Sequence, residues 1–156
     1  KRFHCDPHPG NFAFRPDGSV IIYDFGGVKT LSTDLVERFK ALVRAGRQHD
    51  IPVIEQHLMA LDALAEQGKF PVELYQQWLE VLLRPLTTQY DFAENSAHHD
   101  GVILVKKSLK YWDTFKPSPD TLMVNRTISG HYWNLIHLKV NDNLNDLFEE
   151  LVPPLS

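Results

Sequence analysis

The stretch that constrains this chain most lies near its beginning, at residues 3–27, FHCDPHPGNFAFRPDGSVIIYDFGG. Two short apolar runs, 12–14 and 19–23, flank the four residues RPDG at 15–18. Proline presets φ in a turn and glycine can adopt positive φ, so this pattern predicts a tight β-hairpin. A hairpin of this length brings Asp24, after its second strand, back beside Asn11, before its first.

The residues around the hairpin are expected to form loops. Pro7, Pro9 and Gly10 keep the segment before Asn11 out of regular structure, because proline restricts φ and removes a backbone donor. Gly26 and Gly27 are expected to let the chain turn sharply after Asp24.

Three side chains of this stretch suit phosphoryl transfer from Mg-ATP. Such a site needs one carboxylate to accept or orient the proton of the attacking hydroxyl, and an amide oxygen and a second carboxylate to hold Mg²⁺ on the phosphates. Mg²⁺ prefers oxygen ligands and takes few of them from protein. Asp6 has the residue type for the first role, and Asn11 and Asp24 for the metal pair.

The order of His4-Cys5-Asp6, then Asn11, then Asp24-Phe25-Gly26 resembles the catalytic loop and metal loop of kinase-like proteins. In the residues at these positions it most closely resembles the AarF/UbiB/ADCK family of atypical kinase-like proteins. The resemblance covers most of the chain, but only residues 3–27 are motif-specific. It implies a mainly α fold with a small β-hairpin, the C-terminal lobe of a kinase-like α+β fold. Residues 1–30 would form the loops and hairpin, residues 31–156 the helical part, and the N-terminal lobe would be absent.

The resemblance also implies roles for individual residues. Asp6 would be the catalytic carboxylate, and Asn11 and Asp24 would hold Mg²⁺ against ATP. The implied nucleotide-binding set, in which the two histidines shape the loop, is His4, His8, Asn11, Asp24 and Gly26.

The family further implies ATP binding and hydrolysis that supports ubiquinone synthesis or lipid-linked metabolism, with a lipid or quinone precursor as a further ligand. A cytoplasmic location is expected, with membrane association through segments outside this chain.

Some parts of a kinase site are not in residues 1–156. The chain begins with Lys1 and the motif at residue 4, so we expect a piece of a longer protein. A nucleotide cleft needs a second wall, with a loop over the phosphates and a Lys held by a helix Glu; family members also carry an upstream K-x-G-Q element. We therefore expect the isolated chain to bind Mg-ATP weakly and to turn it over negligibly. The activation segment and Ala-Pro-Glu motif of ordinary protein kinases are missing after Asp24, which argues against a peptide substrate.

Other interpretations stay open at this point. A small-molecule phosphotransferase of the aminoglycoside or choline kinase type uses a similar motif pair, although Pro7 and Phe25-Gly26 favour the UbiB type. A pseudokinase-like interaction module is the other alternative, and the intact Asp6, Asn11 and Asp24 argue against it. Zinc binding by the ligand types at residues 4–8 is disfavoured, because no second His/Cys pair lies at zinc-like spacing.

Composition sets wider limits. The 156 residues suffice for one domain with a real core. A net charge of −4 offers no basic face for nucleic acid. The single cysteine, Cys5, excludes a disulfide framework within the chain. No apolar run of residues 1–156 is long enough for a membrane span, and we expect no signal peptide within them.

Capping residues and apolar periodicity predict the remaining elements. Helices are expected at 32–48, 50–67, 71–85, 100–115, 119–139 and 144–151, with a polar connection at 87–100 and a linker at 116–119.

The same periodicity predicts which side chains face the core. In the fourth helix these are Val102, Val105, Leu109 and Trp112. In the fifth they are Leu122, Met123, Ile128, Tyr132, Leu135, Ile136 and Leu138. Trp78 and Trp133 are also expected in the core. Arg126 resembles an arginine near the start of a helix in the family, and we favour an ion pair in the core over a phosphate contact for it. His98-His99-Asp100 has metal-ligand types, but the sequence favours a solvated loop there.

Overall fold

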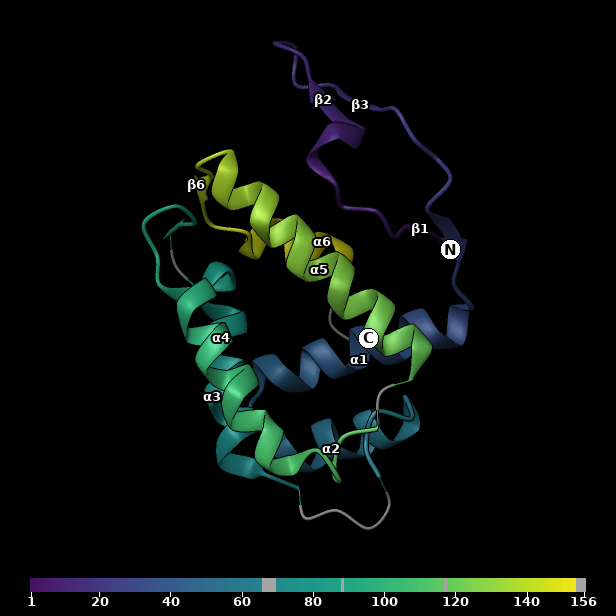
Figure 1. Ribbon diagram of the computed structural model, residues 1–156, viewed down its shortest axis with the longest axis vertical. Helices are drawn as coiled ribbons and strands as arrows, with labels where there is room; N and C mark the ends of the chain where they lie inside the picture. Colours follow the sequence, from purple (N-terminus) through teal and green to yellow (C-terminus); the bar gives the residue numbers. More distant parts are fainter. Residues whose placement is uncertain (66–69, 88, 117, 154–156) are drawn as a thin grey trace.

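Helices form most of the molecule (Figure 1), and the computed structural model describes residues 1–65, 70–87, 89–116 and 118–153. The mainly α fold with small antiparallel strand pairs confirms the fold class predicted from the sequence. The helices are α1 (Thr33–Arg47), α2 (Ile51–Ala60), α3 (Val72–Leu83), α4 (Ala97–Ser108), α5 (Pro119–His137) and α6 (Asn145–Leu151). Short 3₁₀ turns lie at η1 (Pro9–Asn11), η2 (Arg84–Leu86) and η3 (Leu109–Tyr111). Within the described residues, no helix is both long and apolar enough to cross a membrane.

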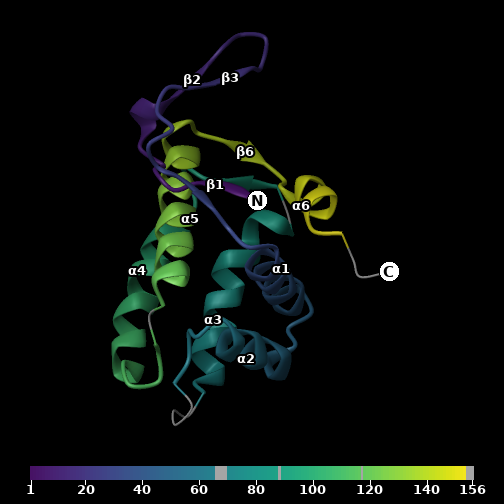
Figure 2. The same ribbon diagram turned by 90° about the vertical axis from the view of Figure 1, so that its right-hand side faces the viewer.

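The strands form separate antiparallel pairs. They are β1 (Arg2–His4) with β4 (Val28–Thr30), β2 (Phe12–Phe14) with β3 (Val20–Ile22), and β5 (Tyr90–Asp91) with β6 (Asn141–Asp142). The β2–β3 hairpin is the predicted one, and Gly18 in its turn has φ +84°. It projects away from the helices, whereas β1 and β4 lie close to α1 (Figures 1 and 2). The two other pairs were not predicted, because runs of two or three residues show no alternation.

Helix starts follow the capping signals in the sequence. Ser32 accepts a hydrogen bond from the Leu35 N–H, and Asp50 accepts one from Val53. Ser118 caps α5 in the same way, immediately before Pro119. Side-chain oxygens at these positions satisfy N–H groups that have no partner within the helix.

The predicted end of the second helix is wrong, because α2 ends at Ala60 and not near residue 67. Asp62 takes a left-handed conformation with φ +55°, and the Ala63 N–H returns to the Leu58 carbonyl at 2.9 Å. This is a Schellman termination, which closes a helix against its last carbonyls. Leu64 then pairs with Phe115. Part of the predicted extension lies outside the described residues.

The polar connection predicted at 87–100 is only partly correct, because strand β5 lies within it and α4 begins at Ala97. Phe92, in its middle, is 1% exposed, and the neighbouring Tyr90 is buried as well. Phe92 packs edge-on against both Tyr90 and Tyr132, and its N–H donates to the Val140 carbonyl at 2.9 Å. Tyr90 and Asp91 form strand β5, and backbone pairing with the residues after α5 satisfies the polar groups of this segment.

The predicted inner face of α4 is wrong too. Leu104 and Ala97 are its buried side chains, on the side where α4 packs against α3. The four residues expected inside are exposed, Trp112 to 77%. The helix is rotated relative to the prediction because Leu104, outside the predicted stripe, provides the contact with the core.

The predicted faces of α5 and of the tryptophans are partly wrong. Thr121, Val124 and Thr127 are the buried residues of α5, while Leu122, Ile128 and Leu138 are exposed. Tyr132, Leu135 and Ile136 do pack against the core, as predicted. Trp78 also packs there, but Trp133 is 44% exposed.

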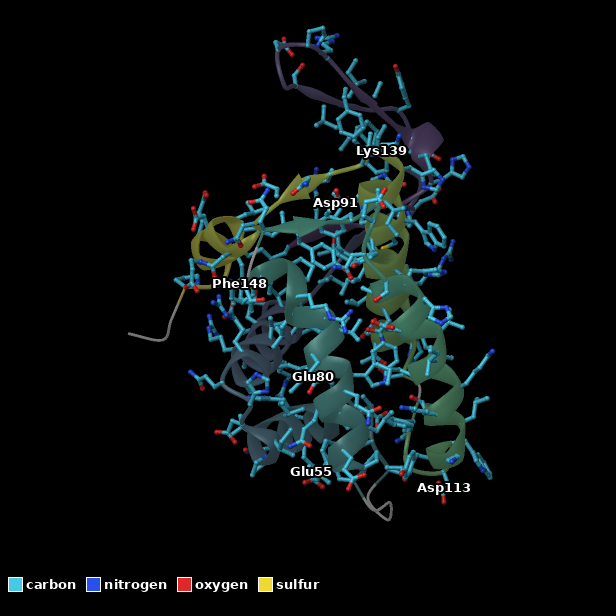
Figure 3. All side chains as sticks on the ribbon, turned by 90° about the vertical axis from the view of Figure 1, so that its left-hand side faces the viewer. Glu55, Glu80, Asp91, Asp113, Lys139 and Phe148 are labelled. Atoms are coloured by element: carbon cyan, nitrogen blue, oxygen red, sulfur yellow. The ribbon has the colours of Figure 1, made fainter. Side chains whose placement is uncertain are left out.

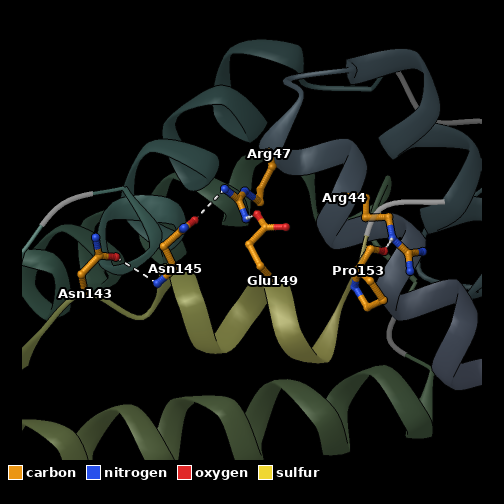
Figure 4. A network of polar contacts seen from close by, with 6 residues as sticks. All are labelled: Arg44, Arg47, Asn143, Asn145, Glu149 and Pro153. Atoms are coloured by element: carbon orange, nitrogen blue, oxygen red, sulfur yellow. Dashed lines mark hydrogen bonds and ion pairs between the residues drawn. The ribbon is translucent and has the colours of Figure 1, made fainter. Parts of the chain in front are cut away.

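The C-terminal helix is attached to α1 by a polar network (Figure 4). The Arg47 guanidinium donates to Glu149 and to Asn145 and lies over the ring of Phe148, 4.8 Å from its centroid. Arg44 Nε donates to the Pro153 carbonyl at 2.9 Å. The predicted short helix at 144–151 therefore forms and is held to the body by arginines of α1.

The burial of Phe92 leads to a stability prediction. Phe92→Ala should lower the free energy of unfolding by about 3–5 kcal/mol, because it removes a ring from a closed core. Urea denaturation measures the change. As a matched aromatic control, Trp112→Ala should change it by no more than about 0.5 kcal/mol. Similar losses for the two variants would contradict the burial described.

Candidate active site

The predicted catalytic carboxylate lies in a hydrogen-bonded loop. Asp6 Oδ2 accepts from Asn11 Nδ2 at 2.8 Å, and Asp6 Oδ1 accepts from the His8 N–H at 3.3 Å. His8 caps the η1 turn, where its Nδ1 accepts from the Gly10 N–H at 3.1 Å. The loop therefore places Asp6 and Asn11 in direct contact, five residues apart in sequence.

These bonds hold the pKa of Asp6 below its ordinary value of 3.8. The amide of Asn11 is the main cause, followed by the His8 N–H, and the charges of His8 and Arg126 act in the same direction. Donors and positive charges around a carboxylate stabilise its ionised form. Asp6 is thus a carboxylate at neutral pH and can accept a hydrogen bond from a hydroxyl.

The second predicted loop is tied to the first through His4. The His4 Nε2 lies 2.7 Å from the Asp24 carbonyl, so Nε2 carries the proton and donates to it. His4 Nδ1 is buried and has no hydrogen-bond partner among the described residues. The Cys5 N–H donates to the Gly27 carbonyl at 2.8 Å, which adds a backbone link between the same two segments.

Asp24 lies at the end of the hairpin, where the sequence predicts it. The Tyr23 N–H donates to the Asn11 carbonyl at 3.0 Å, so the residue before Asp24 pairs with Asn11. Asp24 Oδ1 accepts from the Gly26 N–H at 2.7 Å. The Asn11 Oδ1 and the Asp24 Oδ2 are the oxygens that these bonds leave for other ligands.

The reason for the two glycines differs from the prediction. Neither Gly26 nor Gly27 has positive φ, so neither is needed for a left-handed turn. A Cβ on Gly27 would lie 3.0 Å from the Cβ of Asp6, and one on Gly26 would lie 3.1 Å from Asp24 Oδ1. Both glycines thus lie in tight contact with a carboxylate side chain, and a larger residue at either position would have to displace it slightly.

Helix α5 packs against the loop of Asp6 and donates hydrogen bonds to it. These contacts were not predicted from the sequence. Asn134 Nδ2 donates to the Pro7 carbonyl at 2.8 Å, and Thr127 Oγ1 lies 3.4 Å from the Cys5 carbonyl. Between them, Gly130 leaves room for the Pro7 ring. A glycine in the interior of a predicted helix was the available signal, because glycine there usually marks close packing.

Arg126 projects from α5 and is exposed. Its charge helps to lower the pKa of Asp6, and within the described ranges no ion pair is recorded for it. The prediction of an ion-paired core arginine is therefore wrong. The guanidinium is accessible near the loop.

The donor set can be compared with the needs of Mg²⁺. No group of three or more His, Cys, Asp or Glu side chains in the described part of the chain is arranged to hold a metal. One amide oxygen and one carboxylate, Asn11 and Asp24, fit a cation that keeps its waters and phosphate ligands.

The other residues with metal-ligand types, His98-His99-Asp100, lie elsewhere and have protein partners. Asp100 accepts from Arg84 and from Ser96, and the ring of His98 lies against Trp133.

Comparison with known proteins adds an independent finding. The family described as "ABC1 atypical kinase-like domain" matches residues 1–89. Protein ACTIVITY OF BC1 COMPLEX KINASE 7, chloroplastic, of Arabidopsis thaliana is 39% identical over 66 residues, which are 42% of this chain and 10% of that protein. Uncharacterized protein sll1770 of Synechocystis is 37% identical over 65 residues, 41% of this chain and 11% of that protein. The aligned part thus spans about a tenth of each relative's length.

The environment of Asp6 predicts the effect of removing its main donor. Asn11→Ala should raise the pKa of Asp6 toward 3.8, because the bond that most stabilises the carboxylate is lost. A lowered folded pKa contributes stability above the unfolded pKa, and this contribution is lost as pH falls through the folded value. The variant should therefore lose less stability than the wild type on acidification below pH 3.8. Carboxyl ¹³C NMR titration measures the pKa, and Asn125→Ala, an exposed change on α5, should leave it unaltered.

The close approach of α5 predicts opposite results at two helical glycines. A Cβ on Gly130 would lie 2.1 Å from Pro7 Cγ, whereas one on Gly101 in α4 meets nothing within 4 Å. Gly130→Ala should destabilise the chain by about 1–3 kcal/mol through overpacking. Gly101→Ala should stabilise it by about 0.5–1 kcal/mol, because alanine favours helix. Thermal unfolding compares the melting temperatures of the two variants. Equal shifts in melting temperature would show that α5 is not closely packed against the loop.

Proposed function

This chain belongs to the ABC1 atypical kinase-like family, and from that premise we propose that it supplies the catalytic-loop half of a Mg-ATP-dependent phosphotransfer site. In this proposal Asp6 is the catalytic carboxylate and Asn11 and Asp24 are the metal ligands. His4, His8 and Gly26 keep these residues in place for the nucleotide. Kinase or ATPase activity would belong to the whole protein.

The observation that carries the proposal is the coupling of two loops that are distant in sequence. Asn11 bonds to Asp6 at 2.8 Å, and the hairpin partner of Asn11 directly precedes Asp24. His4 donates to the Asp24 carbonyl at 2.7 Å and so fixes the second loop against the first. A base and two metal-ligand oxygens on one small framework are what phosphoryl transfer needs.

Each residue has a chemical task in this arrangement. Asp6, ionised at neutral pH, would accept the proton of an attacking hydroxyl or water. Asn11 would offer Oδ1, because its Nδ2 is used on Asp6, and Asp24 would offer Oδ2. Bound Mg²⁺ supplies charge neutralisation at the phosphates. Arg126, exposed near Asp6, would contact phosphate.

The acceptor is proposed from family resemblance alone. We propose a role that supports ubiquinone synthesis or lipid-linked metabolism, with a lipid or quinone precursor as the ligand. Asp24 is exposed and Asp6 is half-buried, and another segment would supply the second wall of the nucleotide site.

Turnover of ATP by the full-length protein tests the proposal. Asp24→Asn should lower turnover by about 100-fold or more, because it weakens a ligand that acts in the transition state. Asp17→Asn is the matched control: Asp17 is exposed in the turn of the same hairpin, where it accepts from Ser19. An ATP turnover that Asp24→Asn leaves intact would contradict the proposed role. Absence of turnover in the wild type would favour an interaction module.

The isolated chain offers a second test. Calorimetry should show weak binding of Mg-ATP by residues 1–156, because only one wall of the site is present. Micromolar affinity that Asp24→Asn abolishes would contradict the need for a second wall.

A further inference from the structure

Three aromatic rings form a continuous contact between helix α5 and the base of the hairpin. His131 of α5 lies edge-on to Phe12 of β2, with ring centroids 5.7 Å apart. The Phe12 ring is tilted against His4, with centroids 5.6 Å apart, and all three residues are half-buried. Tilted and edge-on contacts at centroid distances of about 4.5–7 Å stabilise pairs of aromatic rings. We call His131, Phe12 and His4 the three-ring contact.

The three-ring contact reaches both proposed metal ligands, Asn11 and Asp24. Phe12 directly follows Asn11 in the sequence and pairs with Ile22 across the hairpin. At the other end of the contact, His4 Nε2 donates to the Asp24 carbonyl at 2.7 Å. The packing of these rings on α5 therefore bears on where each of the two ligands lies.

The hairpin needs such a support because it projects away from the helices. Figure 3 shows it extending past the end of α5 that the label of Lys139 marks. Farther along the ladder, Phe14 and Val20 are exposed, so this part of the hairpin gains little from packing. A two-stranded hairpin is marginally stable by itself in water. Contacts at its base, where Asn11 lies, are therefore the ones that fix its position.

The ring of His131 is suited to apolar packing. Burial lowers the pKa of His131 below its ordinary value of 6.5, and repulsion from His4 acts in the same direction. The imidazole is therefore neutral at pH 7. Its recorded side-chain partner within the described residues is the Phe12 ring.

We propose that His131 is a positioning residue, whose ring packs on Phe12 and thereby holds the two metal ligands at the separation that Mg²⁺ requires. The inference rests on the proposed function, in which Asn11 and Asp24 bind the cation. His131 itself contacts neither the metal nor the nucleotide in this proposal. Its effect should therefore appear in the Mg²⁺ dependence of the reaction.

The Mg²⁺ dependence of ATP turnover by the full-length protein tests the inference. His131→Ala should raise the Mg²⁺ concentration that gives the half-maximal rate by about threefold to tenfold, the effect of losing one aromatic pair. The rate at saturating Mg²⁺ should change by less than about twofold, because the bonds to Asp6 remain. His131→Phe should restore the wild-type dependence, since it keeps a ring at this position.

Another histidine of the same helix provides the matched control. His137 is exposed, and its ring lies against Trp133 and not against the hairpin. His137→Ala should leave the Mg²⁺ dependence unaltered. Circular dichroism verifies that each variant is folded.

Hydrogen exchange of the Tyr23 amide gives a readout that needs no turnover. This N–H donates to the Asn11 carbonyl at 3.0 Å, so it is protected only while the base of the hairpin is closed. His131→Ala should speed its exchange in the full-length protein by about threefold to tenfold. His131→Phe and His137→Ala should leave its exchange rate as in the wild type.

Two results would overturn the inference. The first is a Mg²⁺ dependence that His131→Ala leaves unchanged; faster exchange of the Tyr23 amide in that variant would then reflect a purely structural role. The second is His131→Phe behaving like His131→Ala, because packing of a ring would then not be what matters. Absence of ATP turnover in the wild type would instead contradict the proposed function. The exchange rate of the Tyr23 amide would then decide by itself whether His131 holds the hairpin.

Discussion

Close packing of helix α5 against the loop of Asp6 is the constraint on which the rest of the site depends. The Pro7 ring packs over Gly130, and Asn134 Nδ2 donates a hydrogen bond to the Pro7 carbonyl at 2.8 Å. Because the loop is irregular, its backbone groups need partners from outside it, and α5 provides them. Asp6 is therefore oriented by a helix more than a hundred residues away in sequence. The hydrogen bonds to Asn11 and His8 then set its ionisation.

Local chemistry explains what the sequence could predict. Turn residues placed the β2–β3 hairpin, and oxygen side chains such as Ser32 and Asp50 marked helix starts. The contact between the Asp6 and Asn11 segments follows from their spacing in a short loop. Interactions of this kind depend on neighbours within a few residues, so they can be predicted from the amino-acid sequence alone.

Long-range packing explains what could not be predicted. Phe92 is buried because residues after α5 pair with its strand, and no local pattern in a polar stretch signals that. The rotation of α4 depends on Leu104, which packs against α3 in the core. Periodicity alone predicted a different inner face for this helix. In the site, the links from α5 to Cys5 and Pro7 join segments about 120 residues apart. Tertiary context decides these cases.

The open hairpin has a consequence for the physical behaviour of the chain. Within the described residues β2 and β3 pair only with each other, so both of their outer edges carry free backbone groups. Phe14 and Val20 are largely exposed on the same ladder. Such a ribbon can accept an added strand and thus template aggregation. Arg15, Pro16 and Asp17 at its tip are of the charged and proline types that oppose such pairing, so the same turn that brings Asp24 back to Asn11 also limits association through the exposed strands.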